Sequence, residues 1–453
     1  MNFKRIFLTC LALIIGCSLM SAKRAYKSDS TKITNYFIQY IQGIAEKPFS
    51  DAFTLSYNEI EGASEFVWNC WREANRLIDE EKVAFTEIPS LSQADSAKIV
   101  IPASLENDAV MTYYFGSKGD KPQPGYPLFI YTHGSGPKAR EWATGLRICS
   151  EFADTPSVYF IPRIPNEGEY YRWWQKGKQY VWEKLIRQAM LSDNINPDRI
   201  YIFGISEGGY GSQRLGSFYA DYLAGAGPMA GGEPLQNAPA ENVGNIAFSL
   251  RTGAEDKGFY RETLTRNIGI ELDSLQKLYP ERYKHWVELI PGRGHSIDYK
   301  PTTPWLKNFT RSPYPKKVIW ENFEMDGIKR KGFYNLAVTE PDTVQSRTRY
   351  DLDIEGNTID LKVSRVNYSV VEKDPQWGIP LKFARSYTEA TKGKVTIYLN
   401  SELVDLRKPV KVVLNGRNVY NGKVKCELSD LVNSCALFFD SRRLFPASIT
   451  VEL

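Results

Sequence analysis

The chain has few residues that bind metals and few long apolar stretches. Of its 453 residues only six are cysteine and three are histidine. No CxxC pair and no Cys/His cluster has the spacing of a zinc site, so a structural metal is not expected. Beyond the first 22 residues, no segment is apolar enough to predict a membrane-spanning helix.

Neither sign of charge dominates the sequence. The chain has 57 Lys and Arg against 53 Asp and Glu, a formal net charge of +4. There is no basic stripe of the kind that binds phosphates, which argues against a nucleic-acid partner. The hydrophobic fraction of 42% is ordinary for a folded protein, and the length predicts two or three domains.

The first 22 residues are typical of an export signal. Lys4 and Arg5 precede an apolar run from Ile6 to Ile15, which is too short to span a bilayer comfortably. The sequence that ends at Cys17, Ile-Ile-Gly-Cys, resembles a bacterial lipobox, in which the cysteine becomes the lipidated first residue. The alternative is an ordinary signal peptide cut after Ala22. We therefore expect export, with membrane attachment only through a lipid on Cys17.

Four of the six cysteines lie beyond the first 22 residues, at positions 70, 149, 426 and 435. Export permits disulfides. Cys426 and Cys435 are close enough in sequence to pair across a hairpin, but burial as free thiols explains them equally well.

Residues 23–97 are expected to form a helical extension, and residues 98–312 an α/β domain. In SEFVWNCWREANRLIDEE the apolar residues recur every three or four positions, as on an amphipathic helix. Strand-like and helix-like segments then alternate, which is typical of a largely parallel sheet with helices on both faces. The strand-like segments are Ala109–Phe115, Pro127–Gly134, Ser157–Pro165, Ile200–Phe203, Ile246–Gly253 and His285–Gly292.

Residues 316–453 are expected to form a separate β-sandwich. A proline-containing linker over 302–315 precedes them, and the hydrophobic pattern beyond it has a period of two. Asn415-Gly416 and Asn421-Gly422 are dipeptides typical of hairpin turns. This region has one tryptophan besides Trp320 at its boundary, Trp377, and a lone tryptophan is more often part of a core than a sugar-binding surface.

The segment RIYIFGISEGGYGS places one serine between glycines where a strand meets a helix. Gly204, Ser206 and Gly208 form the G-x-S-x-G pattern of a nucleophile elbow, whose sharp turn requires small residues on either side of the serine. The following helix would direct its backbone N–H groups at a developing oxyanion. A glycine-rich turn shaped only for packing is the alternative.

A serine hydroxyl needs a base, and histidine is the side chain that titrates near neutral pH. Of the three histidines, His295 follows a strand within PGRGHSIDY, on a segment expected to be an exposed loop. His285 begins a strand, and His133 is expected to shape its loop. His295 is the predicted base.

The base needs a carboxylate partner and the serine an oxyanion hole. Asp256 follows the strand that ends at Gly253 and is the predicted acid, with Glu255 as the alternative. The backbone N–H of Glu207, together with that of Gly134 or Ser135 in YTHGSGP, would bind the oxyanion.

Together HGSG, GISEGG, GAED and GRGH resemble the α/β-hydrolase fold, in its prolyl-oligopeptidase-like and dienelactone-hydrolase-like esterase branch. The resemblance covers about residues 98–310 and implies a nucleophile Ser206, an acid Asp256, a base His295 and no cofactor. Peptidases of this type usually carry an N-terminal propeller. The residues before the core are too few for a propeller, so a peptidase of this type is less favoured than an esterase.

Aromatic residues are dense after the strand Ser157–Pro165, in NEGEYYRWWQKGKQYVWEKL. Tyr171, Trp173 and Trp174 are predicted to bind substrate, because loops there overhang the carboxyl ends of the strands. Packing at a helix start is the alternative. The predicted function is an exported serine esterase that acts on carboxylic esters, such as an acylated glycan. The rival hypotheses are a serine peptidase and an inactive glycan-binding lipoprotein.

Overall fold

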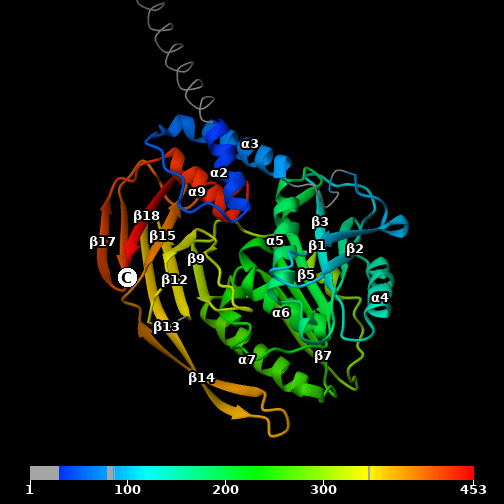
Figure 1. Cartoon of the computed structure of the whole chain (residues 1–453). Helices are drawn as coiled ribbons and strands as arrows, with labels where there is room; N and C mark the ends of the chain where they lie inside the picture. The colour runs from blue at the N-terminus through cyan, green and yellow to red at the C-terminus, as the bar shows by residue number, and fades with distance from the viewer. Residues whose placement is uncertain (1–29, 79–84, 86, 345–346) are drawn as a thin grey trace, which may run out of the picture. The chain divides into compact units, whose positions relative to one another are not determined.

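The computed structural model describes residues 30–78, 85, 87–344 and 347–453 (Figure 1). By their contacts these residues form two compact units. The first comprises the described part of Met1–Glu80 with Tyr398–Asn400 and Val424–Ile449. The second comprises the described part of Glu81–Ile397 with Ser401–Lys423 and Thr450–Leu453. The predicted boundaries at residues 98, 312 and 316 do not coincide with this division. Nor do residues 316–453 form a compact unit of their own.

The first unit is built on three helices, α2 (Ser30–Ile41), α3 (Ile60–Ile78) and α9 (Leu428–Phe438), with α3 in contact with the other two. The predicted amphipathic helix is α3. It buries Trp71, whose ring meets that of Phe37 edge-on at 5.0 Å between centroids. Only strands were predicted after residue 316, so helix α9 differs from the prediction.

The second unit contains an eight-stranded sheet. In spatial order its strands are β1 (Ser96–Val100), β2 (Val110–Lys118), β4 (Ser157–Arg163), β3 (Tyr126–Thr132), β5 (Ile195–Ile205), β6 (Gly225–Met229), β7 (Ala247–Gly253) and β8 (His285–Ile290). Strand β2 is antiparallel to both of its neighbours, and all other neighbours are parallel. The predicted α/β class with a mostly parallel sheet is confirmed.

Helices pack on this sheet, and all but the last of them connect two of its strands. They are α4 (Lys138–Glu151), α5 (Lys176–Leu191), α6 (Glu207–Phe218), α7 (Arg261–Leu278) and the short α8 (Thr302–Leu306). Helix α6 contacts β3, β5 and β6, and α7 contacts β7 and β8. Residues 302–315 were predicted to be a linker, but their first five residues form α8, which packs on β6 and β7.

Stacked aromatic rings fill the centre of the sheet. Phe129 on β3 lies between Tyr159 and Tyr201 on the adjacent strands, with centroid distances of 5.3 and 4.7 Å. All three side chains are buried. Because strands buried on both faces need apolar residues at every position, β3 has no alternating pattern, and all seven of its residues are buried.

Two further sheets follow the α/β part. A six-stranded sheet contains β9 (Lys317–Asn322), β12 (Thr348–Glu355), β13 (Thr358–Lys373), β14 (Pro380–Glu389), β16 (Val410–Leu414) and β17 (Arg417–Gly422). A four-stranded sheet contains β10 (Gly332–Phe333), β11 (Leu336–Glu340), β15 (Lys394–Leu399) and β18 (Ala447–Glu452). The β-rich character predicted for this region is confirmed.

The two predicted hairpin turns have different outcomes. Asn415 and Gly416 connect β16 to β17, and both have positive φ, at 47° and 81°. Asn421 and Gly422 instead belong to strand β17, so the second turn prediction is wrong. An Asn-Gly pair tolerates positive φ but does not require it, which explains why the dipeptide alone misleads.

Candidate active site

Ser206 lies in the sharp turn between β5 and α6. Its φ of 57° and ψ of −113° are strained for a residue with a side chain. The flanking glycines are sterically required. A Cβ atom on Gly204 would overlap the side chain of Thr132, and one on Gly208 would overlap the backbone carbonyl of the same threonine. The small residues that the pattern G-x-S-x-G demands are explained by these two contacts.

Three predicted residues form a hydrogen-bonded chain at the carboxyl ends of parallel strands of the sheet. Nε2 of His295 lies 3.0 Å from Oγ of Ser206, and Nδ1 of His295 lies 2.7 Å from Oδ2 of Asp256. Ser206 follows β5, Asp256 follows β7 and His295 follows β8. Asp256 is buried and the imidazole is about half exposed. In this geometry His295 can accept the serine proton while Asp256 holds its other nitrogen protonated.

An arginine also supports the carboxylate of Asp256. The Arg261 guanidinium donates a hydrogen bond of 2.9 Å to Oδ1, while His295 occupies Oδ2. Burial raises the pKa of Asp256, but the hydrogen bond from His295 and the charge of Arg261 outweigh it, so the pKa lies below its ordinary value. Arg261 begins α7 and was not predicted as part of the site, although it lies only five residues after Asp256. Glu255, the alternative acid, is exposed.

The loop after β3 is held by His133 and two aromatic residues. Nδ1 of His133 lies 2.7 Å from the Gly134 carbonyl, and Nε2 accepts from the Ile164 backbone N–H at 3.1 Å. Burial lowers the pKa of His133 to about 4, so the ring is neutral near pH 7. Both ring nitrogens are occupied, as expected for a residue that shapes the loop.

Tyr171 and Trp173 support this loop rather than a substrate. The Tyr171 hydroxyl donates to the carbonyls of Gly134 and Gly136, and the Trp173 indole donates to that of His133 at 2.9 Å. Trp173 is fully buried and packs against Gly211 of α6. The prediction that Trp173 binds substrate is wrong, and Tyr171 has its hydroxyl committed to the loop.

The predicted oxyanion donors lie around the serine. Glu207 is the first residue of α6, so its backbone N–H has no partner within the helix. Gly134 is close to the serine, since a Cβ atom on it would lie 3.5 Å from that of Ser206. Ser135 lines the same pocket as Ser206. Their role as donors stays a prediction.

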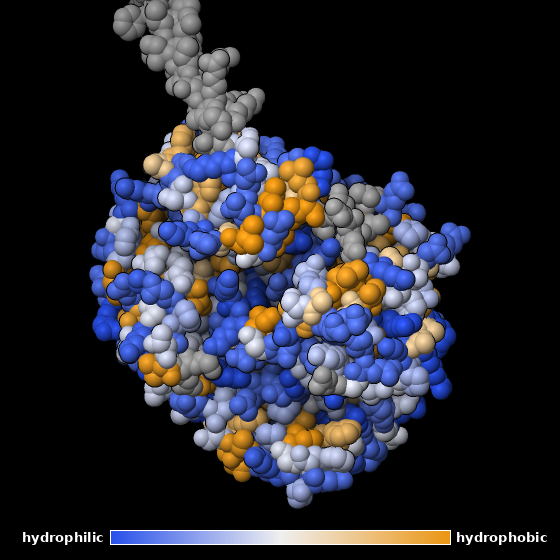
Figure 2. Space-filling view, viewed as in Figure 1, coloured by the Kyte–Doolittle hydropathy of each residue, from blue (hydrophilic) through white to orange (hydrophobic). Residues whose placement is uncertain are grey.

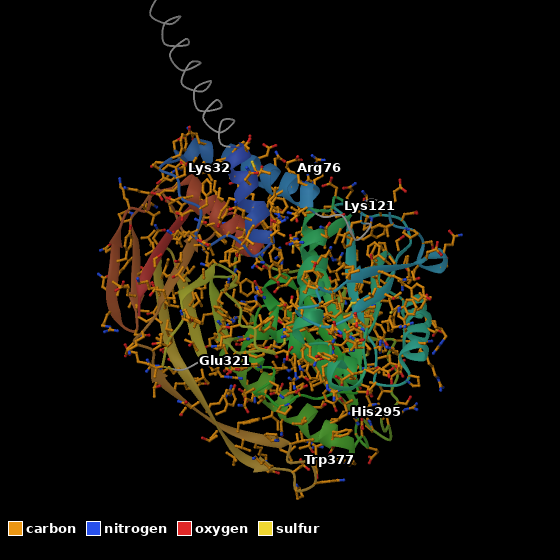
Figure 3. The ribbon with its side chains drawn as sticks, in the orientation of Figure 1. Lys32, Arg76, Lys121, His295, Glu321 and Trp377 are labelled. Atoms are coloured by element: carbon orange, nitrogen blue, oxygen red, sulfur yellow. The ribbon has the colours of Figure 1, made fainter. Side chains whose placement is uncertain are left out.

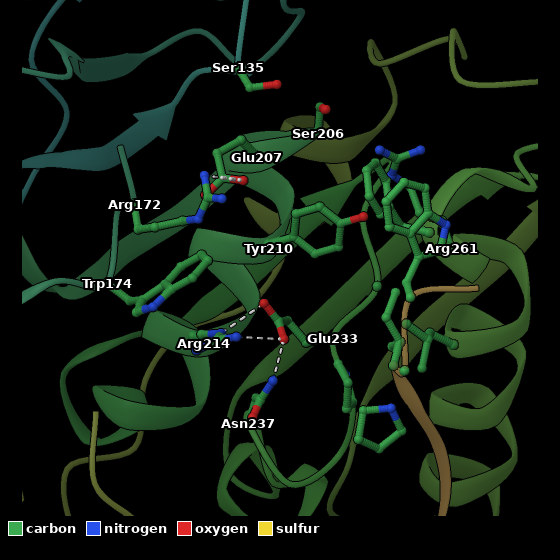
Figure 4. Close-up of a pocket in the computed structure, with 18 residues that line it drawn as sticks. Ser135, Arg172, Trp174, Ser206, Glu207, Tyr210, Arg214, Glu233, Asn237 and Arg261 are labelled. Atoms are coloured by element: carbon green, nitrogen blue, oxygen red, sulfur yellow. Dashed lines mark hydrogen bonds and ion pairs between the residues drawn. The ribbon is translucent and has the colours of Figure 1, made fainter. Parts of the chain in front are cut away.

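Ser206 opens into a pocket of about 650 Å³. Figure 4 shows Trp174 beside Arg214 in its wall, and the guanidinium lies 3.9 Å from the ring centroid. Arg214 also donates two hydrogen bonds to the Glu233 carboxylate, which accepts a third from Asn237. Of the three aromatic residues predicted to bind substrate, Trp174 alone lines the pocket. The contact between Arg214 and Glu233 was not predicted. Arg214 lies in α6 and Glu233 follows β6, and no local sequence pattern pairs the two residues.

Glu207 places a carboxyl group beside the nucleophile. Its Oε2 lies 3.4 Å from the Arg172 guanidinium, whereas its buried Oε1 has no hydrogen-bond partner among the residues that the structure describes. Burial is the main cause that raises the pKa of Glu207 to about 7, although Arg172 opposes it. The Glu207 carboxyl group therefore titrates near neutral pH.

Trp377 lies at the surface rather than in a core. It lies in the turn between β13 and β14, is 56% exposed and lines the pocket. The expectation that it belongs to a core is wrong. In the same turn region, Gly378, Ile379 and Pro380 also line the pocket.

Several other predicted features have separate outcomes. Cys17, Ala22 and the rest of the predicted signal lie outside the described residues. Cys426 and Cys435 are buried free thiols. Within residues 30–78, 85, 87–344 and 347–453, no helix combines the length and the apolar character needed to cross a membrane. The described part of the chain contains no cluster of three metal-binding side chains.

Comparisons with known proteins give only distant structural likenesses. No protein-family model matches the chain, and no curated protein does. A thermostable esterase matches at 19% identity with a TM-score of 0.39, over 49% of this chain and 64% of the esterase. An S-formylglutathione hydrolase from Staphylococcus aureus matches at 14% identity and a TM-score of 0.33, over 48% of this chain and 98% of its own. A ferulic acid esterase from Anaeromyces mucronatus matches at 16% identity and a TM-score of 0.35, over 50% of this chain and 92% of its own.

Proposed function

We propose that this protein is a serine hydrolase that cleaves carboxylic esters, with Ser206 as nucleophile, His295 as base and Asp256 as the supporting acid. The observation that carries the proposal is the continuous hydrogen-bonded chain from Ser206 Oγ through His295 to Asp256, at the edge of a pocket. A packing turn would explain the strained serine but not an imidazole and a carboxylate aligned behind it.

The reaction follows from this arrangement. The Ser206 Oγ–H bond breaks as the proton passes to Nε2 of His295, and Oγ bonds to the ester carbonyl carbon. The resulting oxyanion is held by the backbone N–H groups of Glu207 and of Gly134 or Ser135. The alcohol leaves with the proton from His295. Water then gives a proton to His295 and attacks the acyl-enzyme, and Ser206 recovers its proton as the acid departs.

Acylated glycans are the proposed substrates, on chemical grounds. The pocket combines an aromatic ring, Trp174, with charged and amide side chains, which suits a sugar with a flat apolar face and a rim of hydroxyl groups. We further propose that the chain is exported through its first 22 residues and anchored by a lipid on Cys17, so that it meets such polymers outside the cytoplasm.

Labelling with a fluorophosphonate probe tests the reactive serine. Wild-type protein should be labelled, and Ser206→Ala should not. Rates on aryl acetates and on short peptide amides then separate an esterase from a peptidase, because an esterase should hydrolyse only the former at a useful rate. Well-folded protein that neither reacts with the probe nor hydrolyses any ester would contradict the proposal and favour a binding role.

A further inference from the structure

Two exposed aromatic rings stand together at the pocket. Phe259 and Trp377 both line it, with 47% and 56% of their surfaces exposed and their ring centroids 5.3 Å apart. Phe259 follows β7, whereas Trp377 lies in the turn of the β13–β14 hairpin, seen at the bottom of Figure 1 and with its label in Figure 3. Figure 2 shows hydrophobic patches among hydrophilic residues at that edge. We call Phe259 and Trp377 the aromatic platform.

The hairpin turn that carries Trp377 is fixed rather than a loose tip. The buried Asp374 carboxylate accepts three backbone hydrogen bonds, from Gln376 at 2.9 Å, from Trp377 at 2.7 Å and from Ile379. The backbone N–H of Asp374 donates in return to the Ile379 carbonyl at 3.0 Å. These hydrogen bonds fix the backbone of the turn, so the exposed indole is held at the pocket with little conformational freedom left to lose on binding.

The other half of the platform is held in a strained backbone. Phe259 and Tyr260 have φ values of 52° and 57°, in the left-handed region that residues with side chains rarely adopt. Arg261 follows directly, and its guanidinium lies 5.2 Å from the Phe259 ring while it also bonds Asp256. Strain of this kind at a ligand-binding position is commonly functional, because a relaxed turn would carry the ring elsewhere.

Two polar residues that line the pocket each have a buried atom without a hydrogen-bond partner in the described part of the chain. Glu207 Oε1 and Arg261 Nε are buried and have no hydrogen-bond partner within the described part of the chain, and both residues are more than nine-tenths buried. Arg214, Glu233 and Asn237 add a connected set of planar donors and acceptors in the same wall. Buried polar atoms without partners are costly unless a ligand or water meets them.

From these observations we infer that the aromatic platform is a sugar-binding subsite, on which a pyranose ring of the substrate stacks while a neighbouring unit enters the pocket toward Ser206. The inference rests on the proposed function for the identity of the reacting group. A sugar ring suits the site better than an aromatic acyl group, because it places C–H bonds on the rings and hydroxyl groups near the polar side chains of Arg214, Glu233 and Asn237. The β13–β14 hairpin would then contribute directly to specificity.

Binding to the non-reactive Ser206→Ala protein tests the subsite without catalysis. The probes are the β-1,4-linked tetrasaccharides of xylose, glucose and mannose, with ferulic acid as the aromatic probe, measured by calorimetry. At least one tetrasaccharide should bind saturably, and adding Trp377→Ala should raise its Kd at least tenfold. Trp377→Phe should recover most of the affinity. Phe259→Asn, which removes the ring but tolerates positive φ, should weaken binding at least fivefold.

A matched control comes from the same hairpin. Val371 is 65% exposed on β13 and does not line the pocket, so Val371→Ala should leave Kd within twofold. The inference is overturned if no tetrasaccharide binds, if Trp377→Ala leaves Kd within twofold, or if only ferulic acid depends on Trp377. Trp377-dependent sugar binding by a protein that hydrolyses no ester would contradict the proposed function alone. Ester hydrolysis without such binding would contradict the subsite alone.

Discussion

Nδ1 of His295 and Oδ2 of Asp256 lie 2.7 Å apart, although 39 residues separate them in the sequence. An ionised carboxylate can only accept a hydrogen bond, so Nδ1 of His295 carries the proton and donates a hydrogen bond to Asp256. Nε2 is then left as an acceptor toward Ser206. The hydrogen bond from Arg261 to the other carboxylate oxygen keeps Asp256 ionised and oriented. The tautomer on which the proposed mechanism depends is therefore set by the carboxylate.

Replacing the carboxylate should remove this control. We expect Asp256→Asn to lower kcat on aryl esters by about 10⁴-fold, because the amide can favour the wrong tautomer of His295. The control is Glu255→Gln, one residue earlier on the exposed side of the turn, which should stay within twofold of wild type. Steady-state rates of both variants decide the point. A larger loss in Glu255→Gln would reassign the acid.

The glycines around the serine should be intolerant of a methyl group. A Cβ atom on Gly208 would overlap the Thr132 carbonyl and lie 2.9 Å from that of His133, so the loop after β3 must move. We expect Gly208→Ala to destabilise the protein by more than about 3 kcal/mol or to prevent folding. Gly62→Ala, in helix α3 with open space around its Cβ position, should instead stabilise by about 0.4–1 kcal/mol.

Urea unfolding followed by circular dichroism compares the two glycine variants. Equal and small effects of both would show that the close approach between α6 and the loop after β3 can relax. In that case the turn geometry at Ser206 would not depend on the glycine at position 208.

Adjacent tryptophans should have separable effects. Trp173 is fully buried and bonds the His133 carbonyl, so Trp173→Ala should cost about 3–5 kcal/mol of unfolding free energy. Trp174 lines the pocket and stacks on Arg214, so Trp174→Ala should mainly raise KM for bulky esters. Unfolding curves and steady-state kinetics on both variants test the division. A stable Trp173→Ala protein with a raised KM would reverse the assignment.

Local patterns were enough to predict the alternating strands, the turn at Ser206 and the residues that would meet it. Each follows from short-range chemistry, such as the glycines at 204 and 208 or the loop position of His295 after a strand. The pocket walls could not be found in this way. Glu233, Phe259 and Trp377 come from three separate segments, and their neighbours depend on strand order and on where the β13–β14 hairpin lies.

Some of the misses had a local signal. In α9, the buried Leu428, Leu431, Val432 and Cys435 recur at three-and-four spacing, which predicts a helix rather than the strands expected there. The exposure of Trp377 had no such signal, since the same tryptophan fits a core or a surface. What fixes it is the Asp374 turn, whose backbone hydrogen bonds become visible only in the folded chain.

The carboxyl group of Glu207 should make stability depend on pH. Burial raises its pKa from 4.5 to about 7 in the folded protein, so between these values the folded state holds a proton that the unfolded chain has released. Stability therefore falls as pH rises through this window, by about 3 kcal/mol at most. Glu207→Gln removes the titrating group but keeps its shape and the backbone N–H that would bind the oxyanion. Its free energy of unfolding should therefore decline less than that of wild type between pH 5 and pH 8, measured by urea unfolding at each pH. Parallel pH curves for the two proteins would mean that Glu207 is already ionised in the folded state at pH 5, with Arg172 compensating for its burial.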